Sequence, residues 1–214
     1  MRRLGLLSAV LVLTQGCALL GVQAISRPAL EAGGPHRMDD EGWVALARAR
    51  IAVAARNDRA TAAFIGPAPF VPLPIFPLPP SALETRRPEA TFWVDVAIDP
   101  EGEDFVFDPA DVRLNLGATA DLRPVRMRGP ASVIRGAGRR HTSALCGGDE
   151  AARPISGVAL TQLACVSLEF DMVPPAPDVP FTVSVRGLSD RGTPVEVPTV
   201  RFTKGHRATL DALP

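Results

Sequence analysis

Residues 92–98 read Phe-Trp-Val-Asp-Val-Ala-Ile, and this stretch decides the fold class. Val94, Val96 and Ile98 alternate with other residues and so fall on one face of an extended strand, because successive strand side chains point to opposite faces. The residues that follow, 99–104, read Asp-Pro-Glu-Gly-Glu-Asp, and their Pro and Gly are typical of a turn. The stretch therefore predicts a β-strand with one buried face that ends in a turn.

Short strand patterns of the same kind recur from residue 105 to residue 204. The predicted strands are 105–107, 112–116, 122–127, 155–160, 165–172, 181–187 and 195–202, with 188–192 as a hairpin connection and 128–154 as a long loop. No helical pattern lies between them, although parallel strands would need such crossovers. We therefore expect residues 87–204 to form a mainly β domain, an antiparallel β-sandwich of the immunoglobulin-like type.

The last two predicted strands carry a more specific pattern. They read Phe181-x-Val-x-Val-x-Gly-Leu188 and then Gly192-x-x-Val-x-Val-Pro-x-Val-x-Phe202. This pattern is similar to the closing hairpin of uncharacterised exported bacterial domains with immunoglobulin-like architecture. The resemblance covers some 25 residues, and it implies a fold but no activity.

Residues 39–63 show a different spacing, in which apolar residues recur every three or four positions. These are Trp43, Leu46, Ala47, Ile51 and Ala54. Acidic residues at 39–41 suit the positive start of a helix, and Gly66-Pro67 would end it. The spacing therefore predicts one N-terminal helix over 39–63.

A Pro-rich connector follows over residues 67–80, in which seven residues are proline and all the others are apolar. Proline favours an extended backbone without ladder hydrogen bonds. Its large apolar side chains, which would be unfavourable in water, include Phe70, Leu73, Ile75, Phe76 and Leu78. They could lie in a groove of their own domain, at a membrane interface near an anchor, or on a binding partner such as another envelope protein. We expect packing on the β-domain.

The N-terminus has the layout of a secretory signal peptide. Two arginines precede an apolar run, residues 4–13, which ends shortly before Cys17. A membrane-spanning helix needs about 20 apolar residues, so this run is too short to span. The layout predicts export from the cytoplasm.

Gly16 before Cys17 resembles the lipobox of bacterial lipoproteins, although that family prefers Leu where this chain has Thr14. The resemblance implies that residues 1–16 are removed and that Cys17 carries diacylglycerol and palmitate, with 17–38 as a tether. Ala18, where inner-membrane lipoproteins tend to have Asp, implies the outer membrane, facing the periplasm or the cell surface. The alternative is cleavage after Ala24, which would give a soluble periplasmic protein that binds a ligand or metal.

The other two cysteines, Cys146 and Cys165, form an even pair once Cys17 is acylated. An even pair in an exported chain predicts a disulfide bond. The alternative is a reactive or metal-binding pair, but their spacing matches no compact metal motif and no C-x-x-C motif.

Motifs for catalysis are missing from the sequence. It has no G-x-S-x-G or H-E-x-x-H motif, and His36, His141 and His206 are widely spaced. Acidic residues between 95 and 108 and arginines between 126 and 153 are interpreted as solvated loop charges. Equal numbers of basic and acidic residues, 23 each, argue against nucleic-acid binding. We therefore expect a lipid-anchored cell-envelope protein, a structural or protein-interaction module without enzymatic activity, cofactor or metal.

Overall fold

The computed structural model describes residues 17–30, 34–67, 76–77, 91–117, 121–134, 144–148 and 150–212. The chain divides into a small unit (Met1–Ala24, Ala60–Arg87 and His206–Pro214) and a large unit (Ile25–Arg59 and Pro88–Gly205). The one helix among the described residues is a single 3-10 turn, η1 (Pro109–Asp111). No helix in this part of the chain has the length and apolar character needed to cross a membrane.

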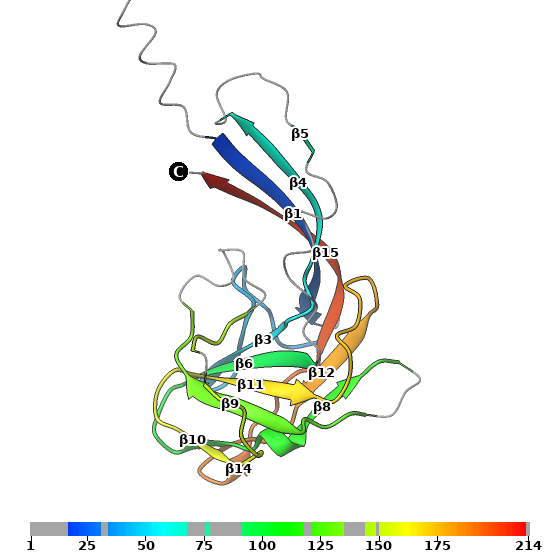
Figure 1. Ribbon diagram of the computed structural model, residues 1–214. Coiled ribbons are helices and arrows are strands. Elements are labelled where there is room, and N and C mark those ends of the chain that lie inside the picture. The colour runs from blue at the N-terminus through cyan, green and yellow to red at the C-terminus, as the bar shows by residue number, and fades with distance from the viewer. Residues whose placement is uncertain are drawn as a thin grey trace, which may run out of the picture. The chain divides into compact units, whose positions relative to one another are not determined.

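Strands make up most of the described chain (Figure 1). They are β1 (Cys17–Leu30), β2 (Trp43–Ala45), β3 (Ala49–Ala55), β4 (Arg59–Pro67), β5 (Phe76–Pro77), β6 (Phe92–Pro100), β7 (Phe105–Phe107), β8 (Val112–Asn115), β9 (Arg126–Ala131), β10 (Val158–Leu160), β11 (Ala164–Phe170), β12 (Phe181–Val185), β13 (Leu188–Asp190), β14 (Thr193–Pro194) and β15 (Val200–Ala212). The sheet orders are β5-β4-β1-β15-β12-β8, β10-β7-β13-β14 and β2-β3-β6-β11-β9. The strands β1, β4 and β15 each run through both units.

The core of the large unit lies between β6 with its neighbours and the strands β8, β12 and β15. The predicted inward face of β6, Val94, Val96 and Ile98, is confirmed, since all three are fully buried in this core. Across the core, the ring of Phe92 in β6 meets that of Phe181 in β12 edge-on, at 5.6 Å between centroids. The antiparallel sheets of the large unit therefore share one hydrophobic core.

The predicted helix over 39–63 is wrong. These residues form β2, β3 and the start of β4. Ile51 and Val53 pair with Ile98 and Val96 of β6 in antiparallel register and turn inward with them. Apolar residues at 49, 51, 53 and 55 satisfy a period of two as well as the helical spacing, and pairing with β6 selects the strand.

Most strand predictions from residue 92 onward agree with the structure, with two shifts. The strand predicted over 122–127 is β9 (Arg126–Ala131), which takes in the start of the predicted loop 128–154, and the strand predicted over 195–202 begins only at Val200. Strands β6, β7, β8, β11 and β12 lie where the alternation placed them. The closing strands β12 and β15 pair in antiparallel register, with Phe181 opposite Phe202. The predicted hairpin connection instead contributes β13, which pairs with β7 and β14 in a separate sheet. Residues 17–30, expected as part of a tether, form β1.

Gly187 allows a close approach of two backbone segments. A Cβ atom added there would lie 2.0 Å from the carbonyl oxygen of Asp108, whose own N–H donates to Gly187 at 2.8 Å. Gly187→Ala must displace one of these segments, so we expect a loss of about 1–3 kcal/mol in unfolding free energy. Gly157→Ala is the control, because no atom lies within 4 Å of the added Cβ. Urea denaturation compares the two variants, and equal values would contradict the close approach.

Candidate functional site

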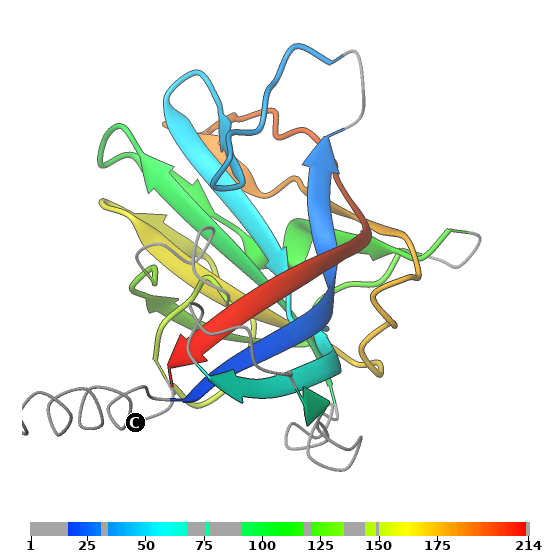
Figure 2. The same cartoon turned by 90° about the horizontal axis from the view of Figure 1, so that it is seen from above.

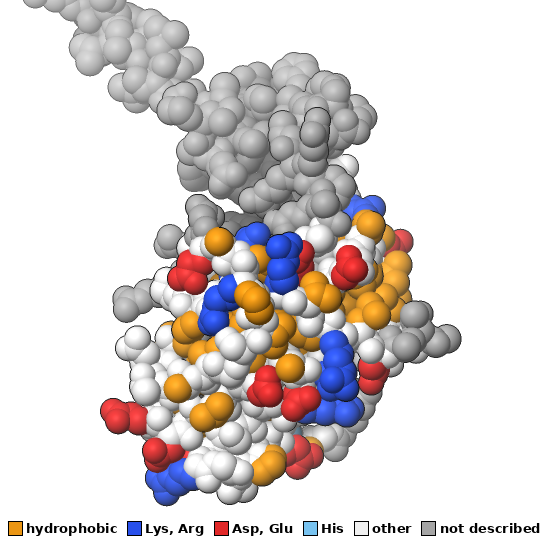
Figure 3. Space-filling view, turned by 60° about the horizontal axis from the view of Figure 1, so that its bottom comes forward, with side chains coloured by type: hydrophobic (Ala, Val, Ile, Leu, Met, Phe, Trp, Pro, Cys, Tyr) orange, Lys and Arg blue, Asp and Glu red, His pale blue; other side chains and the backbone are white. Residues whose placement is uncertain are grey.

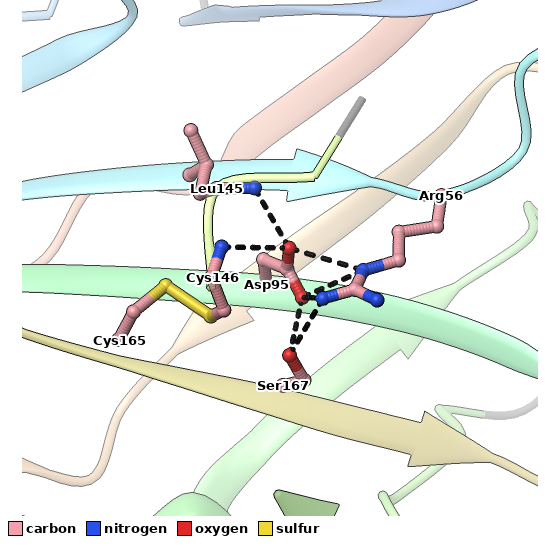
Figure 4. Close-up of polar contacts among 6 residues, drawn as sticks. All are labelled: Arg56, Asp95, Leu145, Cys146, Cys165 and Ser167. Atoms are coloured by element: carbon pink, nitrogen blue, oxygen red, sulfur yellow. Dashed lines mark hydrogen bonds and ion pairs between the residues drawn. A yellow bond between two sulfur atoms is a disulfide. The ribbon is translucent and has the colours of Figure 1, made fainter. Parts of the chain in front are cut away.

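Asp95 lies in the middle of β6, and its side chain is completely buried. Since Val94 and Val96 face the core, Asp95 points to the opposite face of the sheet. There the segment 144–148 covers it, and Leu145 and Cys146 pack into a second apolar cluster with Ala97. Figure 4 shows the carboxylate enclosed between this segment and the sheet.

Four residues hydrogen-bond the Asp95 carboxylate (Figure 4). Arg56 places its Nε 3.1 Å from both oxygens and its Nη2 2.9 Å from Oδ1. Ser167, directly opposite on β11, donates to Oδ1 at 2.7 Å. The backbone N–H groups of Leu145 and Cys146 donate to Oδ2 at 2.8 and 3.2 Å. Both oxygens are therefore occupied, and the cluster holds two parts of the fold together.

The predicted disulfide between Cys146 and Cys165 is confirmed. Their Cα atoms are 5.2 Å apart, within the usual range for such a bond. Cys165 belongs to β11, and Cys146 belongs to the segment that also donates to Asp95. The bond and the carboxylate therefore fasten the same segment to the same face of the sheet.

The acidic residues between 95 and 108 do not form one cluster. Asp99 pairs with Arg50, Asp104 with Arg191, and Asp108 accepts from the N–H of Ala110 at the start of η1. The hydrogen bond with Asp99 raises the pKa of the Arg50 guanidinium. Among the described residues, no three His, Cys, Asp or Glu side chains are placed to hold a metal ion.

Three of the arginines expected on a solvated loop have specific partners. Arg126 donates from two nitrogens to Glu169, both at 2.9 Å, and this hydrogen bonding raises the pKa of its guanidinium. Arg128 stacks over the ring of Trp93 at 4.0 Å. Arg153 donates to the carbonyl of Gly129. Figure 3 shows basic and acidic side chains interspersed on the face of the large unit that it presents.

One cleft of about 490 Å³ opens on the large unit beside Arg48 and Asp190. Its size falls in the range of small-molecule sites. However, its central charges already pair with protein groups, Arg48 with Asp190 and Arg191 with Asp104. His36, Thr193 and Glu196 also line the cleft, and the buried Oδ1 of Asp190 has no hydrogen-bond partner.

The residues that the sequence singled out fall in different strands. Cys17 is the first residue of β1, and Phe76 belongs to β5. Phe70, Leu73, Ile75 and Leu78 lie outside the described residues. The buried contacts of Asp95 were not predicted, although a charged residue inside an apolar strand is a signal that sequence alone supplies. Comparison with protein-family models, curated proteins and solved structures found no match for this chain.

Proposed function

We propose that the protein is an exported bacterial lipoprotein, anchored through diacylglycerol on Cys17, that acts by contacts with another protein of the cell envelope. The disulfide is the main observation that supports this proposal. The chain has three cysteines, and the bond between Cys146 and Cys165 leaves Cys17 as the third. A stable disulfide is typical of an exported protein. Cys17 stands four positions after the end of the signal-like apolar run, where acylation would occur.

The large unit supports a binding role. Its antiparallel sheets and shared core are consistent with an immunoglobulin-like β-sandwich, a fold that many proteins use to present surfaces to partners. Both oxygens of the buried Asp95 carboxylate accept hydrogen bonds from the protein, which favours a structural role for this residue. Ala18, directly after the anchor residue, favours the outer membrane as its location.

Acylation of Cys17 can be tested by metabolic labelling with an alkyne fatty acid. We expect the chain to incorporate label and Cys17→Ser to lose it, because the thiol of Cys17 is the acceptor. The double variant Cys146→Ser/Cys165→Ser is the matched control, and it should keep the label. A wild-type chain that is exported without label would contradict the anchor and favour the soluble periplasmic alternative. Fractionation of labelled cells then distinguishes the outer from the inner membrane.

A further inference from the structure

The small unit contains one end of a sheet at which several chain segments meet. In the order β5-β4-β1-β15, the start of β1, the end of β4 and the end of β15 lie together in both views (Figures 1 and 2). The hydroxyl of Thr61 in β4 donates to the carbonyl of Val22 in β1 at 3.0 Å. Counting five residues from this contact in opposite directions along the two strands brings Gly66 to the level of Cys17. We call this the Cys17 end.

The β4–β5 edge of this end is apolar over a long stretch of sequence. Ile65 pairs with Phe76 and Phe64 with Pro77, so β5 lies beside the last residues of β4. None of the nineteen residues from 62 to 80 has a polar side chain. By contrast, Arg59 and Thr61 at the other end of β4 are polar and exposed. Polarity therefore falls along β4 toward the Cys17 end.

The anchor residue and the sheet are directly joined. The sequence predicted a tether over 17–38, but β1 begins at Cys17 itself. An acyl chain on Cys17 would therefore hold the end of the sheet at the membrane surface, without a flexible spacer. This step rests on the proposed acylation.

We propose that the β4–β5 edge of the Cys17 end, Phe64–Pro67 with Phe76–Pro77, inserts into the bilayer beside the acyl chains. Apolar surface next to a lipid anchor gains free energy by entering the interface, and interfacial segments enter it to about 5–10 Å. A bilayer suits this edge better than a protein partner, because Phe64–Pro67 and Phe76–Pro77 include no polar side chain that could orient a partner by a hydrogen bond. Strand β15 lies on the opposite side of β1 from this edge.

A tryptophan depth measurement on the acylated chain tests this insertion. Phe76→Trp places a reporter at the proposed edge, and Thr61→Trp is the matched control, four residues or about 13 Å before Ile65 along β4. The proteins are reconstituted in vesicles of phosphatidylethanolamine and phosphatidylglycerol with brominated acyl chains. The signal of the wild type, from Trp43 and Trp93, is subtracted. We expect quenching and a blue shift for Phe76→Trp, and neither for Thr61→Trp.

Two other results of the depth measurement would overturn the insertion. An acylated Phe76→Trp protein without quenching overturns the insertion and leaves the anchor intact. Equal quenching at both positions also overturns it, because the sheet would then lie along the surface. Ile65→Trp, at the paired position, repeats the measurement if Phe76→Trp does not fold. Failure of the anchor itself is seen separately, as loss of the fatty-acid label.

Discussion

Replacing Asp95 with alanine should lower the unfolding free energy of the large unit by about 3–5 kcal/mol, the cost of removing one partner from a buried ion pair. The change leaves the Arg56 guanidinium, only 18% exposed, without its carboxylate. It also removes the acceptor for the N–H groups of Leu145 and Cys146 and for the Ser167 hydroxyl. Each of these donors then stays buried without that acceptor, which adds a desolvation cost.

Asp99→Ala is the matched control for Asp95→Ala. Asp99 belongs to the same strand and also pairs with an arginine, Arg50, but the arginine side chain is 54% exposed. Exposed pairs contribute about 0–1 kcal/mol, so this variant should change the urea midpoint little. The double variant Asp95→Val/Arg56→Met should recover part of the loss, since it removes both charges together. Equal losses for Asp95→Ala and Asp99→Ala would refute the special role of Asp95.

The sequence of β6 predicted half of this arrangement. Alternation of Val94, Val96 and Ile98 identifies the inward face, because a strand side chain repeats its direction every second residue. It does not show that Trp93, Asp95 and Ala97 are buried too. For Asp95 and Ala97, that burial depends on residues 144–148, about fifty positions further along the chain, packing on the outer face. Arg128 of β9 stacks on Trp93. The sequence pattern around Asp95 therefore suggests a solvated acid, because it contains no sign of a segment far along the chain that buries this residue.

The error over 39–63 has a related cause. Ile51, Val53 and the alanines around them satisfy both periods, and alanine has the highest helix propensity. Antiparallel pairing of residues 49–55 with β6 decides in favour of the strand. Strand pairing involves two segments, so the periodicity of one segment alone does not predict it. The disulfide was predictable because compartment and cysteine parity constrain it without reference to the fold.

Removing the disulfide with Cys146→Ser/Cys165→Ser should cost about 3 kcal/mol, because the unfolded chain regains the freedom of a loop of this length. The two cysteines are 19 positions apart. Serine at both positions also replaces buried sulfur in the apolar cluster with Ala52, Ala97 and Leu145. The urea midpoint should therefore fall clearly below that of the wild type.

Reduction supplies the control for this prediction. A thiol reductant should lower the wild-type midpoint toward that of the double variant, and it should leave the double variant unchanged. Thiol titration of the denatured, non-reduced protein should detect no thiol from Cys146 or Cys165 in the exported chain. Two titratable thiols there would contradict the bond. A wild-type midpoint that does not respond to reductant would show that the bond adds no stability.

The losses from Asp95→Ala and from disulfide removal should not add, because both changes release the segment 144–148. In the wild type, the disulfide holds the N–H of Cys146 in place, and that N–H donates to Asp95 at 3.2 Å. Once the segment is released by one change, the other has fewer contacts left to break. We expect a coupling of about 0.5–3 kcal/mol in a double-mutant cycle, with the combined loss smaller than the sum. Strict additivity would mean that bond and carboxylate stabilise the fold independently, and that the contacts of Leu145 and Cys146 with Asp95 survive without the disulfide.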